Sequence, residues 1–271
     1  MRREDIDPAL AVLDKYPLSI LSRVILVRGR EIKIAYLVPG IGLNKDEISR
    51  RENIANVIVS PGTKVDILPP STGPKSIENR VEEAFASTSH LPLVYRYSND
   101  YDAFVIGCFG DPGLRAAREL TRKPVVGPAE ATLHLASQLA DRFTIIAPTR
   151  TAVKLIEDVI AMHGFKDRVV SVRSIEVPVL KIARGGETVR KIAEDVLSIA
   201  EAEKSEALVL GCMSMGFALV DEVIRKETDI PVLNPVKVSL NTAEVLARLG
   251  LSHSPTTYPK ADIDKLKHIL T

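Results

Sequence analysis

The chain has 271 residues, 45% hydrophobic and 26% charged, which is the composition of a globular protein long enough for two domains. Its formal net charge of +1 offers no attraction for nucleic acid or for an anionic membrane surface, so we expect neither partner. The two cysteines lie far apart, without a Cys-x-x-Cys pair. This spacing argues against a disulfide scaffold or a cysteine-rich zinc site and favours the reducing cytoplasm.

Residues 1–31 precede the regular pattern that fills the rest of the chain. Their apolar run, residues 18–27, is too short to span a bilayer and contains Arg23. Acidic residues near the start, Glu4 and Asp5 among them, argue against a signal peptide. We therefore expect an N-terminal extension that packs on the body of the protein or on a neighbouring subunit.

From residue 32 onward, strand patterns alternate with helical patterns. The strands are expected at residues 32–38, 64–68, 104–107, 124–127, 143–147, 169–179, 207–210 and 231–233. The helices are expected at residues 45–59, 76–88, 114–120, 130–140, 152–163, 188–203, 217–226 and 238–249. This alternation predicts an α/β fold with parallel sheets flanked by helices, in which ligands bind at the carboxyl ends of the strands.

The first strand ends in a glycine-rich turn, Pro39-Gly40-Ile41-Gly42. A glycine-x-glycine after a first strand is part of the dinucleotide-binding fingerprint, but Lys45 stands where the third glycine belongs. The match is therefore too weak to predict a nucleotide cofactor.

The third strand ends in a cysteine that is followed at once by a turn and a helix, in the motif Cys108-Phe-Gly-Asp-Pro-Gly-Leu114. Asp111 is placed to cap the helix over residues 114–120, with Pro112 at its first position. Free backbone N–H groups at a helix start favour a thiolate, so we expect the pKa of Cys108 to be lowered.

The second half of the chain repeats this arrangement. Residues 207–212, Ala-Leu-Val-Leu-Gly-Cys, match residues 103–108 position by position, and Pro-Val-Leu-Asn-Pro at 231–235 matches Pro-Val-Val-Gly-Pro at 124–128. The chain is therefore predicted to be a duplicated half. Two lobes related by a pseudo-two-fold axis would bring Cys108 and Cys212 to opposite walls of one cleft.

Two facing thiols suit a defined chemistry. One thiolate can remove a proton from a carbon next to a carbonyl, while the opposite thiol supplies a proton to the other face. Backbone N–H groups at the helix starts would hold the enolate oxygen. A single cysteine at a strand end is usually a small buried apolar residue, but the equivalent positions of Cys108 and Cys212 favour the functional interpretation.

The motif around Cys108 resembles the aspartate/glutamate/hydantoin racemase superfamily, and within it the hydantoin and allantoin racemases. The segments Gly73-Pro74-x-Ser76-Ile77-Glu78 and Glu130-Ala131-x-x-His134 also match that branch, whereas amino-acid racemases typically follow the first cysteine with Asn-Thr. The resemblance implies cofactor-independent racemisation by Cys108 and Cys212, a small-molecule substrate, no metal and a homo-oligomer. It also implies lobe one at residues 32–120 plus 231–271 and lobe two at residues 121–230.

Substrate contacts are expected from the loops that surround the two thiols. The candidates are Pro39, Gly40, Ser76, Phe109, Gly110, Met213 and Ser214. Ser76 is equally placed to cap the helix over residues 76–88. Two loops depart from the family pattern. Val38-Pro39-Gly40-Ile41 stands where the family has Asn-Pro-Asn-Thr, and Met213-Ser214 replaces a small pair after the second cysteine. The thiol chemistry tolerates both changes, but the substrate cannot be carried over.

Three alternatives stay open: a racemase of acidic amino acids, another isomerase or decarboxylase of the superfamily, and a two-lobed binding protein whose cysteines are structural. The remaining polar candidates favour simpler interpretations. His134 lies inside a predicted helix and is expected to be a surface or packing residue, and the histidines form no metal-binding set. Arg50 and Arg51 are expected to lie on a solvated helix face.

Overall fold

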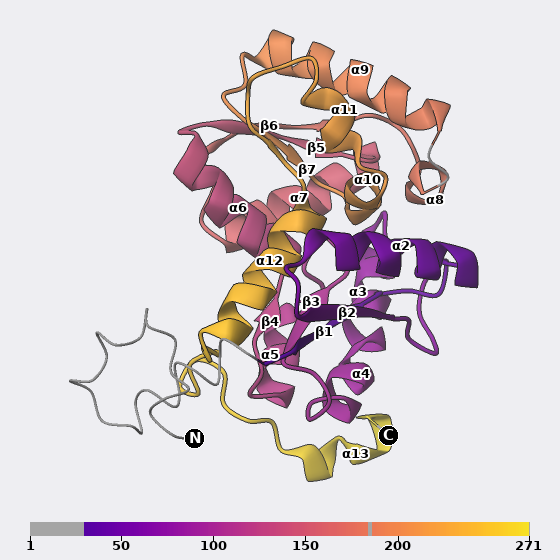
Figure 1. Cartoon of the computed structure of the whole chain (residues 1–271), viewed down its shortest axis with the longest axis vertical. Helices are drawn as coiled ribbons and strands as arrows, with labels where there is room; N and C mark the ends of the chain where they lie inside the picture. Colours follow the sequence, from indigo (N-terminus) through magenta and orange to yellow (C-terminus); the bar gives the residue numbers. More distant parts are fainter. Residues whose placement is uncertain (1–29, 184–185, 271) are drawn as a thin grey trace, which may run out of the picture.

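The computed structural model describes residues 30–183 and 186–270, so residues 1–29 of the predicted extension lie outside the described part. It contains two four-stranded parallel sheets (Figure 1). The first has the order β2-β1-β3-β4, from Ile32–Leu37 (β1), Thr63–Leu68 (β2), Ala103–Ile106 (β3) and Val125–Val126 (β4). The second has the order β6-β5-β7-β8, from Phe143–Ala147 (β5), Val169–Ser174 (β6), Leu208–Leu210 (β7) and Val232–Leu233 (β8). The predicted α/β fold is confirmed.

The helices follow the strands in the same way in both halves. Those of the first half are Lys45–Ile58 (α2), Arg80–Ser89 (α3), Leu91–Arg96 (α4), Leu114–Leu120 (α5) and Pro128–Leu139 (α6). Those of the second half are Arg150–Met162 (α7), Val179–Ile182 (α8), Glu187–Glu203 (α9), Met213–Phe217 (α10), Val220–Ile224 (α11) and Pro235–Arg248 (α12). The chain ends with Ile263–Lys265 (η3) and Lys267–Leu270 (α13). No helix within residues 30–183 and 186–270 has the length and apolar character needed to cross a membrane.

Some of the predicted helices were wrong. The short helices α4 and α8 were missed, and in place of one helix at residues 217–226 the structure has α10, which already begins at Met213, and α11. The break lies at Leu219, whose φ of 54° takes the backbone into the left-handed region. Because such a residue cannot continue an α-helix, α10 ends and α11 starts in a new direction.

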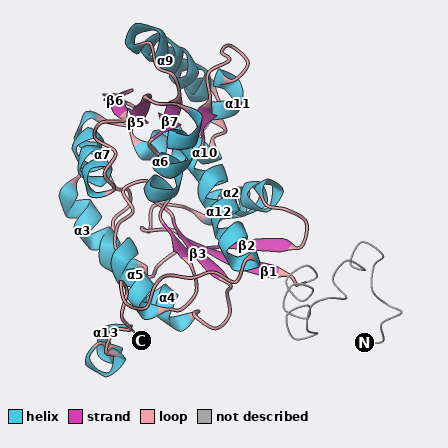
Figure 2. Cartoon of the chain, turned by 90° about the vertical axis from the view of Figure 1, so that its left-hand side faces the viewer, coloured by secondary structure: helices cyan, strands magenta, loops and turns pink. Residues whose placement is uncertain are grey.

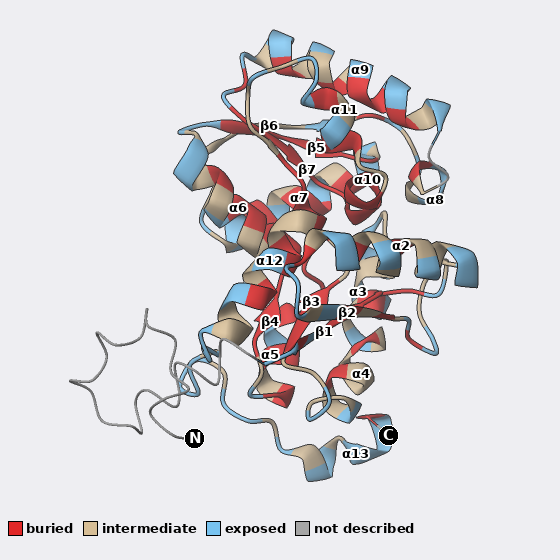
Figure 3. Cartoon of the chain, in the orientation of Figure 1, coloured by how far each residue is buried: buried red, intermediate tan, exposed pale blue. Residues whose placement is uncertain are grey.

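The first sheet has an apolar core on each face, since successive side chains of a strand point to opposite sides. Ile34 and Tyr36 pack with apolar residues of α2 and α12, whereas Ala35 and Leu37 pack with those of α4 and α5. Figure 3 shows the buried residues concentrated on the strands and on the inner faces of the helices. Helices therefore cover both faces of the sheet.

Helices α6 and α12 each leave the sheet in which the preceding strand lies. Leu133 of α6 packs in the core of the second sheet with Ile145 and Val209, although β4 belongs to the first sheet. Leu240 of α12 packs in the core of the first sheet, although β8 belongs to the second. Figures 1 and 2 show α12 running from the second sheet alongside the first. The two exchanged helices also contact each other, which joins the two halves.

This exchange corrects the expected positions at which the chain changes lobe. Boundaries at residues 120 and 230 assign β4 to lobe two and β8 to lobe one, but the pairings Phe104↔Val125 and Leu208↔Val232 place each strand in the other sheet. The chain crosses only after these strands, where α6 and α12 begin. The description of the halves as separate domains stays a proposal.

Candidate active site

The glycines after β1 allow two loops to pack closely. A Cβ atom on Gly40 would lie 2.3 Å from the Pro74 carbonyl oxygen, and one on Gly42 would lie 1.8 Å from that of Lys75. The Ile41 N–H donates to the same Pro74 oxygen at 2.9 Å. This contact accounts for the glycine-x-glycine pattern without a nucleotide, and it holds the loop after β1 against the loop after β2.

A glycine precedes each of the two cysteines and fixes its position in the same way. Gly107 N–H donates to the Leu37 carbonyl at 2.8 Å, and Gly211 N–H donates to the Ile146 carbonyl at 2.8 Å. A Cβ atom on Gly107 would lie 2.5 Å from that Leu37 oxygen, and one on Gly211 would lie 2.8 Å from that Ile146 oxygen. Only glycine fits between these neighbouring strand ends, so each cysteine emerges at the carboxyl end of a sheet.

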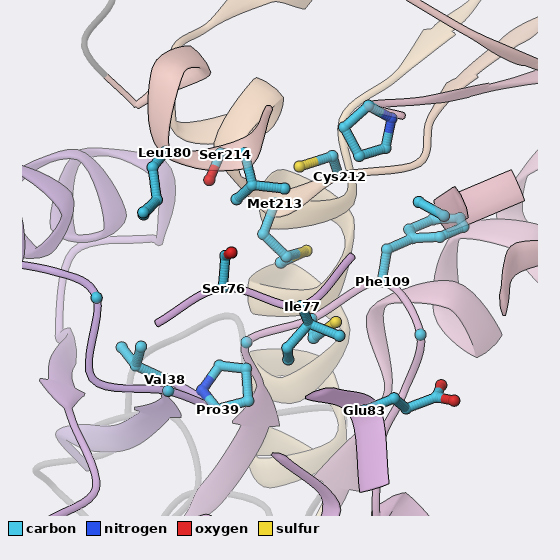
Figure 4. Close-up of a pocket in the computed structure, with 18 of the residues that line it drawn as sticks. Val38, Pro39, Ser76, Ile77, Glu83, Phe109, Leu180, Cys212, Met213 and Ser214 are labelled. Carbon is cyan, nitrogen blue, oxygen red and sulfur yellow. The ribbon is translucent and has the colours of Figure 1, made fainter. Parts of the chain in front are cut away.

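Both cysteines line one cavity between the two halves of the molecule (Figure 4). Every residue predicted to contact substrate also lines it: Pro39, Gly40, Ser76, Phe109, Gly110, Met213 and Ser214. Figure 4 shows Pro39 and Cys212 on opposite sides, with Ser76 between them. The rest of the wall is mostly apolar, with contributions from Val38, Leu43, Ile77, Leu155, Ile156, Val179 and Leu180. The sequence therefore predicted which loops meet, while the roles of the individual residues stay predictions.

Three charged residues in the wall were not among the predicted candidates: Arg51, Lys75 and Glu83. Arg51 is only 4% exposed, so its assignment to a solvated helix face was wrong. The sequence does contain a signal, because Arg51 follows Ile48 by three residues and precedes Ala55 by four, which puts it on the apolar side of α2. Burial raises the pKa of Glu83 from its ordinary value.

The expected cap by Ser76 is also corrected. Helix α3 begins at Arg80, and its N-cap is Asn79, whose side-chain oxygen accepts from the N–H groups of Val81 and Glu82 at 3.1 Å each. Ser76 lies before the helix, in the cavity wall. Asparagine caps a helix as well as serine does. Because Asn79 lies three residues closer to the first turn of α3, it is the N-cap.

Asp111 caps a different helix from the one predicted. Its buried carboxylate accepts from the N–H groups of Ala129 and Glu130 at 2.9 Å each, at the start of α6 rather than α5. Helix α5 instead starts after Gly113, without a side-chain cap. His163 Nε2 lies 3.5 Å from the same carboxylate. Asp111 thus ties the Cys108 loop to the helix that crosses to the second sheet.

Burial changes the acidity of both thiols. It raises the pKa of Cys108 to about 12. The Gly110 N–H lowers this pKa, whereas the nearby groups Cys212, Asp111 and Glu83 raise it. The predicted lowering was therefore wrong, because desolvation of a thiolate outweighs a backbone N–H. Burial raises the pKa of Cys212 too, but the N–H groups of Met215 and Ser214, together with Arg51, oppose it.

His134 lies at the surface, as expected. Its Nδ1 lies 2.8 Å from the Glu130 carbonyl oxygen, and its ring packs edge-on against Phe165 with centroids 5.0 Å apart. It does not line the cavity with the thiols. Among the described residues, no group of three or more His, Cys, Asp or Glu side chains is arranged to hold a metal ion.

Comparison with known proteins identifies relatives of this arrangement. The Asp/Glu/Hydantoin racemase family matches residues 49–243. A hydantoin racemase of Pseudomonas sp. (strain NS671) is 33% identical over 201 residues, which are 73% of this chain and 80% of that protein. A hydantoin racemase of Paenarthrobacter aurescens is 34% identical over 207 residues, covering 74% of this chain and 85% of that protein.

Solved structures agree with these sequences. The allantoin racemase from Klebsiella pneumoniae superposes with a TM-score of 0.79 at 29% identity, covering 85% of this chain and 94% of its own. The resemblance drawn from the cysteine motif is therefore confirmed. The chain belongs to the Asp/Glu/hydantoin racemase family and is an isomerase.

Proposed function

We propose that this protein racemises hydantoin-like small molecules without a cofactor, with Cys108 and Cys212 as its acid and base. The observation that carries the proposal is the single cavity to which each half of the chain contributes one thiol. Both thiols are free, and each follows a strand and a glycine in the same way. Equivalent groups on opposite walls are what proton transfer on both faces of one carbon requires.

The reaction would proceed through an enolate. A thiolate on one wall takes the proton from the stereocentre, and the C–H electron pair moves toward the adjacent carbonyl oxygen. The neutral thiol on the other wall then donates its proton to the opposite face, so the carbon is inverted and the negative charge has passed from one sulfur to the other. Exclusion of water by the apolar wall would strengthen the hydrogen bonds that hold the enolate oxygen.

The substrate class is inferred from relatives and from the wall. The curated relatives are hydantoin racemases and the superposed structure is an allantoin racemase, all acting on compounds that their names state. Apolar residues such as Leu43, Leu155 and Leu180 offer room for an uncharged ring and its substituent. We therefore expect a 5-substituted hydantoin or allantoin-like compound.

A racemase of acidic amino acids is the second candidate, and the charged wall residues favour it. Arg51 and Lys75 are cations that suit a carboxylate, and Glu83 is an anion that suits an ammonium group. Against it, Arg51 already bonds to Glu47 and Ser214. The hydantoin class therefore stays first.

Two further expectations belong to the proposal. Both cysteines are free in the structure, and a reducing compartment such as the cytoplasm would keep them so. Self-association is expected from the family resemblance and is tested by light scattering of the full chain.

The test is to incubate the full chain with single enantiomers of 5-substituted hydantoins, allantoin, aspartate and glutamate, and to follow optical rotation and chiral chromatography. Loss of rotation of a hydantoin or of allantoin, above the buffer rate, supports the first candidate. Racemisation of aspartate or glutamate alone would replace it with the second. Binding without racemisation of any of them would contradict both and favour a binding protein.

A further inference from the structure

Arg51 carries a positive charge from the first half of the chain to the loop that holds Cys212. Its Nη2 donates to Ser214 Oγ at 3.0 Å, and its Nε donates to Glu47 Oε1 at 2.7 Å. Its guanidinium also lies 4.9 Å from the centre of the Phe217 ring. Ser214 and Phe217 both belong to α10, which begins directly after Cys212. These contacts fix the guanidinium in the cavity wall beside that thiol.

The charges around Arg51 do not cancel. Glu47 is the anion that bonds to Arg51, and the same carboxylate accepts two hydrogen bonds from Arg50, at 2.7 and 2.8 Å. Arg50 Nη1 additionally donates to the Phe217 carbonyl at 3.0 Å. Two cations thus share one anion, and Arg51 is the buried one, with 5% of its side chain exposed against 39% for Arg50. Such a charge is costly unless an anion compensates it.

The two thiols differ in their ability to supply that anion. Cys212 faces Arg51, the Ser214 hydroxyl and the N–H groups of Ser214 and Met215, all of which favour a thiolate. Cys108 faces the carboxylates of Asp111 and Glu83, which disfavour a second negative charge nearby, and has only the Gly110 N–H in compensation. The two cysteines occupy equivalent positions in the repeat, but the groups around them favour a thiolate at Cys212 more than at Cys108.

We propose that Arg51 is a positioning residue that makes Cys212 the more readily ionised of the two thiols, so that Cys212 serves as the base and Cys108 as the neutral acid opposite. The assignment of Cys212 as the base rests on the two-thiol function above. The order in which the two sulfurs ionise is independent of that function, because it can be measured without a substrate. The titratable and charged groups around Cys212 are Arg51 with Arg50 and Glu47 on α2, Tyr36 on β1, Cys108 after β3, Lys75 before α3 and Glu83 on α3.

The test is alkylation with iodoacetamide, in which the thiolate sulfur bonds to the methylene carbon and iodide leaves. The rate at each cysteine is followed by mass spectrometry between pH 5 and 10. Because Cys212 is buried and Cys108 is partly exposed, the pH midpoint of each rate is compared, not its absolute value. We expect the Cys212 midpoint to lie below that of Cys108, whose rate should still be rising at pH 10 because burial raises its pKa to about 12. The reverse order would overturn the proposal.

Variants of the charge cluster give shifts of opposite sign. Arg51→Met should raise the Cys212 midpoint by about one pH unit or more, which is about a tenfold loss of rate below the midpoint, and Arg51→Lys should restore most of it. Glu47→Gln removes the shared anion and should lower the midpoint. The Cys108 midpoint should move less in every variant.

Thermal unfolding is measured first for Arg51→Met and for Glu47→Gln. If one variant is unfolded, the Cys212 midpoint of the other still tests the proposal. A folded Arg51→Met protein with an unchanged Cys212 midpoint would contradict the proposal, and so would a Glu47→Gln protein with a raised one. A failed racemisation assay would instead remove the proposed function and leave the charge assignment standing.

Discussion

The two cysteine loops occupy equivalent places in the repeat but offer their sulfurs different surroundings. Each follows a glycine whose N–H bonds to the neighbouring central strand, at 2.8 Å in both halves. Beyond that point the loops diverge, with Phe109-Gly110-Asp111 after Cys108 and Met213-Ser214-Met215 after Cys212. The first loop brings a buried carboxylate near its thiol, whereas the second meets a buried guanidinium.

The repeat thus determines where the two thiols lie, and the local side chains determine how readily each one ionises. A reaction that inverts a carbon needs one thiolate and one thiol at the start of each turnover. Two identical loops would make both cysteines equally ready to ionise, whereas different neighbouring side chains favour ionisation of one sulfur.

The largest effect is expected from removing either thiol. Cys108→Ala and Cys212→Ala should each lower racemisation by about a thousandfold or more, because each removes one of two proton-transfer groups. Ligand affinity, measured by calorimetry, should change little in both variants. Normal turnover in either variant would mean that the corresponding cysteine is structural.

The next effect concerns the glycine before each cysteine. Gly107→Ala and Gly211→Ala should each reduce the free energy of unfolding by about 2–3 kcal/mol, since the new methyl group meets a backbone carbonyl oxygen of the adjacent strand. Gly110→Ala is the matched control, because the nearest atom to its methyl group would be the end of the flexible Glu83 side chain, at 3.1 Å, and no backbone atom is among its nearest contacts. Urea denaturation should separate the control from both variants, and equal losses in all three would contradict the packing argument.

The caps of the exchanged helices differ between the halves in an informative way. Asp111 caps α6 from the cysteine loop and Gly127 is the N-cap residue, whereas Asn234 is itself the N-cap of α12 and packs against Gly216 of the cysteine loop. Asp111→Ala and Asn234→Ala should each cost about 1–2 kcal/mol in urea denaturation. Asp111→Asn keeps an acceptor and should cost less. A loss of unfolding free energy in only one of the two alanine variants would contradict the equivalent capping roles of Asp111 and Asn234.

The smallest effect is a pH dependence confined to the first half. His253 Nε2 accepts from the Val125 N–H of β4 at 2.8 Å, and burial, assisted by Arg118, lowers the pKa of His253 from 6.5 to about 4. The folded protein keeps this ring neutral while the unfolded chain binds a proton below pH 6.5. The stability it contributes is therefore complete above pH 6.5 and is lost as the pH falls through about 4.

His253→Gln should accordingly make the loss of Tm between pH 7 and 5 smaller by about 2–4 °C. Burial also lowers the pKa of His90 to about 4, so part of the acid sensitivity should persist in this variant. His134→Gln, at a surface histidine, serves as the control and should keep the full dependence. Identical pH profiles for His253→Gln and the unchanged protein would contradict this account.

Much of the fold followed from the sequence because its signals are local. Alternating strand and helix patterns predicted both sheets, and the repeated Gly-Cys ends predicted that Cys108 and Cys212 would meet in one cavity. The crossing points were displaced because short strands such as Val125–Val126 carry no mark of the sheet that they join. Pairing between strands, which the sequence does not encode locally, decides that assignment.

The chemistry of the site was less accessible from the sequence. The cap by Asp111 was assigned to the nearest helix, but its carboxylate reaches Ala129, 18 residues further on. The expected surface position of Arg51 was wrong, although its spacing from Ile48 and Ala55 indicates burial. The pKa of Cys108 was predicted to fall because a helix start follows it, yet desolvation of the thiolate dominates. Each error concerns contacts between residues distant in the chain.

In the proposed reaction, two thiols, one from each half of the chain, invert one carbon. Its most direct test is NMR and polarimetry of a single-enantiomer 5-substituted hydantoin or allantoin in D2O, with the unchanged protein and with Cys108→Ser and Cys212→Ser. The account predicts loss of rotation with deuterium entering at the stereocentre for the unchanged protein, and no racemisation by either variant. Racemisation that persists in either serine variant, or that occurs without deuterium uptake, would contradict it.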